Sequence, residues 1–165
     1  MKPVKHTPAL GLAMAGIIAA LYVVLTYLAS LFGLASYAIQ VRFSEALCIL
    51  SAFTPWAIPG LTLGCFLANL LTGCIWQDVL FGTLATLIGA LGGYLLRKFP
   101  WLVPLPTVLA NTIIVPFVLA YAYHFEGGVG YFMLTVGAGE VISAYALGMA
   151  LYFALKPLKK RLLRS

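Results

Sequence analysis

Residues 44–73 read SEALCILSAFTPWAIPGLTLGCFLANLLTG, and this stretch decides how many times the chain crosses a membrane. It carries one charge, Glu45, and it is too long for a single helical crossing, which takes about 20 apolar residues. Thr54-Pro55 and Pro59-Gly60 interrupt it, because the residue before a proline resists the helical conformation and glycine ends helices. We therefore predict a short pass over residues 44–54 and another over residues 58–73.

The composition of the whole chain is that of a membrane protein. Hydrophobic residues make up 63% of the 165 residues, charged residues make up 8%, and the mean hydropathy is +1.05. A soluble domain has about 25% charged residues, so this chain could not cover its surface with polar groups in water. A soluble enzyme, a nucleic-acid-binding domain and a disordered chain are excluded. The net charge of +6 is interpreted as membrane topology.

Three basic clusters set the topology. They are Lys2 and Lys5, then Arg97 and Lys98, then Lys156, Lys159, Lys160, Arg161 and Arg164. Basic residues near membrane helices favour the cytoplasmic side, so an even number of crossings separates the clusters. Beside the two passes above, the predicted helices cover residues 8–31, 79–97, 105–124 and 130–157. The prediction is an all-α bundle of six transmembrane helices in one domain, residues 1–165, with both termini cytoplasmic and a short second helix.

Candidate site residues lie toward the predicted outer side. Arg42 is there against the positive-inside trend, and Glu45 follows Ser44. A structural alternative explains these residues equally well: Ser44 would cap the helix, Glu45 would face its dipole, and Arg42 would anchor to headgroups.

Further polar residues interrupt the apolar segments that follow. Asn69 and Asn111 are amides in apolar helices, and each needs a hydrogen-bond partner inside the bundle. Trp76, Gln77 and Asp78 lie together at a predicted loop. Each residue also has a structural alternative. Trp76 would lie at the membrane interface, and Asp78 would place its charge at the N-terminus of a helix. The two amides would hydrogen-bond a neighbouring helix.

Glu140 is the most isolated charge in the chain. It lies within GAGEVISAY at 137–145, which also contains Tyr145, and the glycines before it allow close approach of a ligand. A lone carboxylate inside a span is a functional-site hypothesis by default. The structural alternative is a buried ion pair between Glu140 and Arg42.

Several chemistries have no motif here. The chain has no GxxxxGK[ST], HExxH or GxSxG pattern. Its cysteines, Cys48, Cys65 and Cys74, lie in apolar stretches without a CxxC pattern. We predict no catalytic residues, no metal, no cofactor and no nucleic-acid partner; the chain is not expected to be an enzyme.

A series of stretches resembles the QueT family of substrate-binding (S) components of energy-coupling factor (ECF) transporters. They are VRFSEAL at 41–47, TPWAIPG at 54–60, GCFLANLLTG at 64–73, QDVLFGTLATL at 77–87 and GAGEVISAYALG at 137–148. The resemblance implies a six-helix bundle in a bacterial cell membrane that captures a queuosine precursor, a 7-deazaguanine base, from outside. It also implies partners: a transmembrane coupling protein and two cytoplasmic ATPases.

The first helix carries small residues on two stripes, Gly11, Ala15 and Ala19 on one and Ala9, Ala13, Gly16 and Ala20 on the other. Small side chains four residues apart let helices approach closely in lipid. The resemblance implies docking of the coupling protein on such a stripe, and we assign it to Gly11, Ala15 and Ala19.

If the ligand is the 7-deazaguanine base that the resemblance implies, each polar residue has an expected role in binding it. A deazaguanine presents two donors, which a carboxylate can accept together, beside a carbonyl. Glu140 is preferred for the donors, with Glu45 as the alternative. Candidates for the carbonyl edge are Arg42, Asn69, Gln77 and Asn111, and candidates for stacking are Trp76 and Tyr145.

Two other functions stay open at this point. One is an S component for another vitamin or micronutrient. The other is a structural membrane protein without a ligand, in which Glu140 pairs with Arg42 and no pocket exists.

Overall fold

The computed structural model describes residues 8–33 and 41–158, and within these ranges the chain forms helices and turns and contains no strand. The predicted all-α class is confirmed. Four helices are long and apolar enough to cross a membrane, namely Pro8–Leu31, Trp76–Leu95, Pro100–Ala122 and Val129–Leu155, and two apolar helices, Phe43–Ala52 and Ala57–Leu71, are shorter. The chain is thus a multi-pass membrane protein, and six crossings with cytoplasmic termini stay a prediction.

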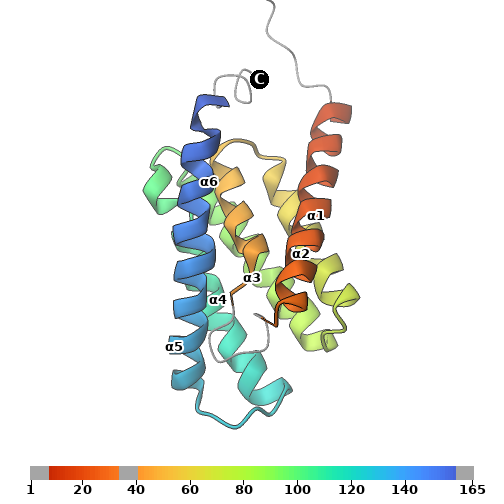
Figure 1. The fold of residues 1–165 in the computed structure, drawn as a ribbon, viewed down its shortest axis with the longest axis vertical. Helices are drawn as coiled ribbons and strands as arrows, with labels where there is room; N and C mark the ends of the chain where they lie inside the picture. Colours follow the sequence, from red (N-terminus) through yellow and green to blue (C-terminus); the bar gives the residue numbers. More distant parts are fainter. Residues whose placement is uncertain (1–7, 34–40, 159–165) are drawn as a thin grey trace, which may run out of the picture.

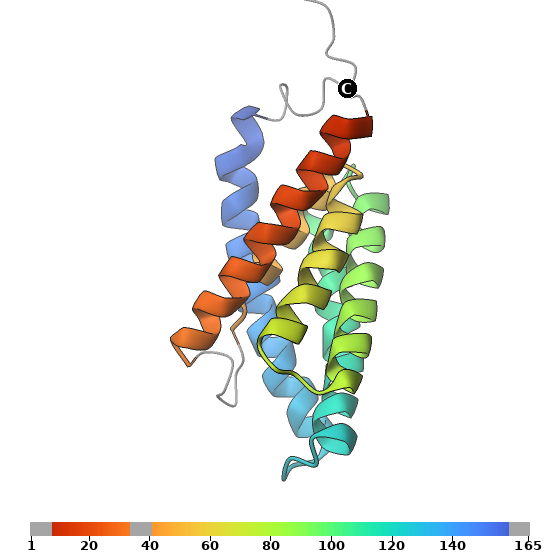
Figure 2. The ribbon, with the colours of Figure 1, turned by 90° about the vertical axis from the view of Figure 1, so that its right-hand side faces the viewer.

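The elements follow one another along the chain with two π-helical interruptions. They are α1 (Pro8–Leu31), η1 (Phe43–Ala52), α2 (Ala57–Leu71), α3 (Trp76–Leu95), η2 (Pro100–Leu102), α4 (Leu105–Phe117), π-helical η3 (Val118–Ala122), α5 (Val129–Glu140), π-helical η4 (Val141–Leu147), α6 (Gly148–Leu155) and η5 (Lys156–Leu158). The start of α1 and the end of α6 lie at one end of the molecule, and α4 and α5 are connected at the other (Figure 1, Figure 2).

The short second pass, η1, is a 3₁₀ helix in the interior of the bundle. Residues 44–49 are all buried. At a rise of about 2.0 Å per residue its ten residues span about 20 Å, which is less than a hydrocarbon core of about 30 Å. The helix begins about halfway along the molecule and runs toward the end where α1 starts (Figure 1). Arg42 and Glu45 therefore enter the bundle interior, and the headgroup-anchor alternative does not hold.

Helices α1 and α2 approach closely through small residues. A Cβ atom placed on Gly64 would lie 2.6 Å from the Cβ of Tyr22 and 3.0 Å from the Cα of Ala19, and one on Gly60 would lie 2.9 Å from the Ala15 carbonyl oxygen. Such distances are below van der Waals contact, so only glycine fits at both positions. The tight contact buries one side of α1 and places Tyr22 against the centre of the bundle.

This packing places the residues of the predicted docking face inside the bundle. Gly11, Ala15 and Ala19 are all buried, since a Cβ on Gly11 would overlap the Trp56 indole and the two alanines pack against α2. These residues serve the internal α1–α2 contact and form no exposed surface. The second small-residue stripe is exposed, and it consists of Ala9, Ala13, Gly16 and Ala20.

We expect Gly64→Ala to lower the free energy of unfolding by about 1–3 kcal/mol, the usual range for overpacking a core. The added methyl would meet the root of the Tyr22 side chain, which cannot swing away. Gly16→Ala is the matched control, because a Cβ there has nothing within 4 Å and alanine raises helix propensity. Thermal unfolding of both variants in detergent checks this, and equal melting temperatures would contradict the described contact.

Candidate ligand-binding site

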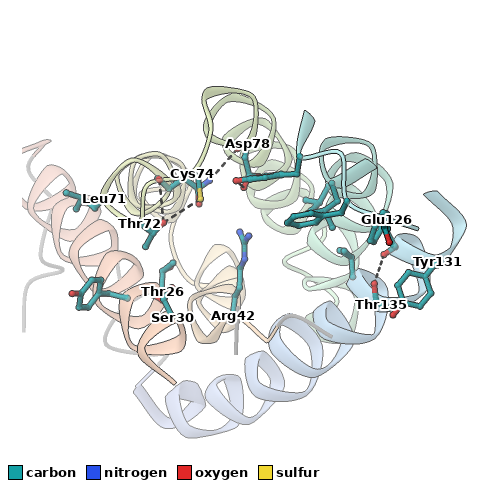
Figure 3. A pocket seen from close by; sticks show the side chains of 18 residues that line it. Thr26, Ser30, Arg42, Leu71, Thr72, Cys74, Asp78, Glu126, Tyr131 and Thr135 are labelled. Atoms are coloured by element: carbon teal, nitrogen blue, oxygen red, sulfur yellow. Dashed lines mark hydrogen bonds between the residues drawn. The ribbon is translucent and has the colours of Figure 1, made fainter. Parts of the chain in front are cut away.

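A cavity of about 790 Å³ lies among α1, α2, α3, α4 with η3, and α5. Its lining reaches Phe125 and Glu126 in the connection between α4 and α5, so it extends toward the end of the molecule opposite the start of α1. Figure 3 shows Arg42 pointing into its middle, with Thr26 and Thr72 on one side and Thr135 on the other. Polar groups thus surround a volume large enough for a small organic molecule.

A small polar recess of about 10 Å³ continues this cavity inward. It shares Arg42, Val115 and Val136 with the large cavity. The rest of its lining is Glu45, Cys65, Gly82, Thr86, Asn111 and Glu140. The recess therefore brings together two carboxyls, an amide and a guanidinium from three separate segments, namely the start of η1, α4 and α5.

Glu140 is the last residue of α5 and is 7% exposed. Among the described residues, no group hydrogen-bonds its buried Oε2 atom. A buried acceptor without a donor is costly, so this oxygen is open to a donor from a ligand. The structural alternative predicted an ion pair between Arg42 and Glu140. Arg42 does not hydrogen-bond this oxygen, which argues against that alternative.

The π-helical segment η4, directly after Glu140, holds the entry to η1. The hydroxyl of Ser143 accepts a hydrogen bond from the Arg42 backbone N–H at 3.1 Å, and the Ala144 carbonyl accepts one from the Cys48 thiol at 3.8 Å between heavy atoms. π-Helical turns occur often at functional sites. Here the wide turn fixes Arg42 beside Glu140, although the two are far apart in sequence.

Glu45 is tied to α1. The Tyr22 hydroxyl donates to Glu45 Oε1 at 2.5 Å, and the Thr26 hydroxyl donates to Ser44 Oγ at 2.8 Å. Tyr22 is 2% exposed and Glu45 is 3% exposed. Ser44 makes no capping hydrogen bond at the start of η1, so the predicted cap is wrong. Its hydroxyl instead helps α1 hold the first turn of η1, and with it the orientation of the Glu45 carboxyl.

Asp78 and Asn69 form a second polar group in the wall of the large cavity. The Asn69 amide donates to the Asp78 carbonyl at 3.5 Å, and the Tyr123 hydroxyl donates to Asp78 Oδ2 at 3.0 Å. The Ile75 backbone N–H donates to the Tyr123 oxygen at 3.4 Å. Burial and the charge of Asp78 raise the pKa of Tyr123, which keeps its phenol a donor. These bonds join the α2–α3 turn to the end of η3.

The structure brings together six of the nine predicted binding residues. They are Arg42, Glu45, Asn69, Asp78, Asn111 and Glu140.

The other three predicted binding residues line neither the cavity nor the recess. Trp76 is 68% exposed at the start of α3, and Gln77 follows it. Tyr145 packs beside the cluster of Ile49, Phe53 and Met149. Its side chain therefore lies against this cluster and outside the recess.

Sequence reasoning missed several residues of the cavity wall. Thr26 and Ser30 of α1 line the cavity. Together with Tyr22, which bonds Glu45, they recur every fourth residue, and this polar stripe in an apolar helix was a usable signal. Aromatic walls come from Tyr123, Phe125, Tyr131 and Phe132. The rings of Tyr123 and Phe125 are stacked, with centroids 5.3 Å apart, and these residues replace Trp76 and Tyr145 as stacking candidates. Among residues 8–33 and 41–158, no group of three His, Cys, Asp or Glu side chains could hold a metal ion.

We expect Tyr22→Phe to lower the free energy of unfolding by about 1–3 kcal/mol, because the Glu45 carboxyl loses its buried donor. Tyr94→Phe is the control, since Tyr94 lies near the end of α3 beside Arg97 and takes no part in the cavity. Thermal unfolding distinguishes the two variants. If removing either hydroxyl has the same small effect, Tyr22 does not anchor Glu45.

Comparison with known proteins assigns the chain to a family. The model of the QueT transporter family matches residues 12–157. The queuosine precursor transporter QueT of Lactococcus lactis subsp. cremoris (strain MG1363) is 39% identical over 84 residues, which are 50% of this chain and 49% of that protein. The alignment thus spans about half the length of this relative, and no solved structure matches the chain. Because the family match runs from α1 to η5, the chain belongs to the QueT transporter family.

Proposed function

We propose that this protein is the membrane substrate-binding subunit of an ECF-type transporter, and that it captures a queuosine precursor of the 7-deazaguanine class from outside the cell. The family membership and the name of the relative, a queuosine precursor transporter, support the substrate class. The cavity between the helices supports a role in capturing a small molecule. In this proposal the protein binds the base and other subunits supply the energy.

The observation that carries the proposal is the buried Oε2 of Glu140 without a hydrogen-bond partner. The edge of a deazaguanine presents a ring N–H beside an amino group, and a carboxylate accepts two such donors side by side. Glu140 would therefore receive the donors. Asn111 and Arg42, which line the same recess, would serve the adjacent carbonyl oxygen of the base.

The large cavity offers a place for the flat body of the base. Rings stack on aromatic side chains for about 1–3 kcal/mol per base. Tyr123 and Phe125 line the cavity and are already stacked on each other, and Phe132 lies across the same space. Asp78 and Asn69 would hold the wall in shape or contact a substituent of the base. The site thus combines hydrogen-bonding groups for the base edge at its inner end with aromatic walls farther out.

Energy for uptake would come from partners. The chain has no nucleotide-binding motif, so concentrative uptake requires a transmembrane coupling protein and two cytoplasmic ATPases. The exposed stripe of Ala9, Ala13, Gly16 and Ala20 on α1 lets a partner helix approach closely. We assign the docking face to this stripe in place of Gly11, Ala15 and Ala19.

The alternatives make different predictions. A structural protein without a ligand was expected to pair Glu140 with Arg42 and to have no pocket; the orphaned oxygen and the 790 Å³ cavity argue against it. An S component for another vitamin would share the fold and would bind a different compound. Mass spectrometry of small molecules that copurify with the protein from cells supplied with isotope-labelled 7-deazaguanine precursors separates the two. Enrichment of the labelled base is the expected result, and a different copurifying vitamin would overturn the proposal.

A further inference from the structure

The recess at the inner end of the cavity has a size and a lining that restrict what can enter it. Its volume of about 10 Å³ is close to the least that holds one water molecule. A ring cannot enter such a space, whereas a single heavy atom with its hydrogens can. Since the recess shares Arg42, Val115 and Val136 with the large cavity, a substituent can enter the recess while the ring stays outside.

We propose that this recess is a subsite for one unsubstituted aromatic amino group, which the two carboxyls of Glu45 and Glu140 recognise. This inference rests on the proposed function and extends it, because it states which 7-deazaguanines the protein accepts. The exocyclic amine must be present, and it must carry both of its hydrogens.

The lining favours a group with two hydrogen-bond donors. No group of the described residues donates to the buried Glu140 Oε2, and Glu45 lies on the same recess. An amino group carries two hydrogens and can serve both carboxyls, whereas a hydroxyl carries one. An aromatic amine meets this condition and is small enough for the recess.

The walls of the recess are held in place. Tyr22 anchors the Glu45 carboxyl, and the Thr86 hydroxyl donates to the Gly82 carbonyl at 3.0 Å. Thr86 and Asn111 are each 4% exposed. A methyl group on the amine would remove one donor and would also need space that these fixed side chains occupy. Both effects weaken binding, so the subsite discriminates against a missing amine and against a methylated one.

Three matched bases test the subsite by calorimetric titration of the purified full-length protein: 7-deazaguanine, 7-deazahypoxanthine, which lacks the amine, and N2-methyl-7-deazaguanine. We expect the first to bind at least about tenfold more tightly than either of the others. Equal affinity for all three would overturn the amino subsite and leave the proposed function standing. Binding of none of the three would contradict the proposed function, and the subsite with it.

A variant with an enlarged recess gives an independent result. Glu140→Asp keeps the carboxyl and removes one methylene, so the affinity ratio between N2-methyl-7-deazaguanine and 7-deazaguanine should shift by about tenfold toward the methylated base. Gln77→Asn also removes one methylene, from a residue that lines neither the cavity nor the recess, and should leave this ratio unchanged. If Glu140→Asp binds 7-deazaguanine with the wild-type ratio, Glu140 does not limit the recess and the subsite is wrong. If it does not fold, the three-base series on the wild type decides alone.

Discussion

Glu140→Gln is expected to weaken binding of 7-deazaguanine by about tenfold to hundredfold, which corresponds to 1.4–2.8 kcal/mol. The substitution keeps the size of the side chain and replaces one acceptor oxygen with an NH₂ group. That group would face a donor of the base, and a buried donor left unpaired costs about 1–3 kcal/mol. The fold should survive, because Glu140 Oε2 has no hydrogen-bond partner to lose and removing a buried charge relieves desolvation.

Calorimetric titration together with a thermal melt of the same variant checks this expectation. Glu126→Gln is the matched control, since Glu126 is exposed in the outer cavity wall, and it should bind almost as the wild type does. The ion-pair alternative makes the opposite prediction, with a lower melting temperature and unchanged affinity. That outcome would remove Glu140 from the site and leave Glu45 as the reading carboxyl.

Ala13→Trp combined with Gly16→Trp is expected to abolish ATP-driven uptake in proteoliposomes that contain the coupling protein and both ATPases. These residues lie on the exposed stripe of α1, and nothing lies within 4 Å of a Cβ on Gly16. Small side chains allow a partner helix to approach α1 closely, and two indoles there would prevent this approach. Base binding by the isolated variant should stay at the wild-type level, because the stripe faces away from the cavity.

Ala15→Trp gives the contrasting result that the structure requires. Ala15 packs against α2 at Gly60, so an indole there should lower the melting temperature and disturb base binding as well. Pull-down of the coupling protein measures complex assembly, and calorimetry measures base binding, so the two defects can be told apart. Normal assembly of the double tryptophan variant would show that docking occurs on another face.

The helical class could be predicted because it depends on properties that the sequence carries directly. Long uncharged segments need helices to satisfy their backbone hydrogen bonds in lipid. Pro55 lies between η1 and α2, whereas Pro59 lies in the first turn of α2 and does not interrupt it. The 3₁₀ conformation of η1 could not be predicted in this way. It depends on packing among α1, α3, η4 and α6, which no local pattern encodes.

Residues of the cavity wall could be predicted where a polar side chain interrupts an apolar helix and needs a partner inside the bundle. Glu140, Asn111 and Asn69 interrupt apolar helices, and all three line the cavity or its recess. Trp76 and Tyr145 were predicted from the chemistry of their rings alone. The directions of their side chains depend on where α3 begins and on the π-helical segment η4.

The two small-residue stripes of α1 show the same limit. Both small-residue stripes of α1 satisfy the same spacing rule, and the choice between them depends on Gly60 and Gly64 in another helix. Only the three-dimensional packing shows that α2 covers Ala15 and Ala19.

The most direct test of the account is the affinity of the purified wild-type protein for 7-deazaguanine compared with 7-deazaadenine, measured by calorimetric titration. The two bases have nearly the same size and stacking surface, but 7-deazaadenine presents a ring acceptor where 7-deazaguanine presents the N–H donor. Glu140 Oε2 would face this acceptor without a hydrogen between them. We expect binding of 7-deazaguanine with at least about hundredfold preference, a difference of 2.8 kcal/mol. Equal binding of the two bases, or tighter binding of 7-deazaadenine, would contradict recognition of the paired ring N–H and amino group by Glu140.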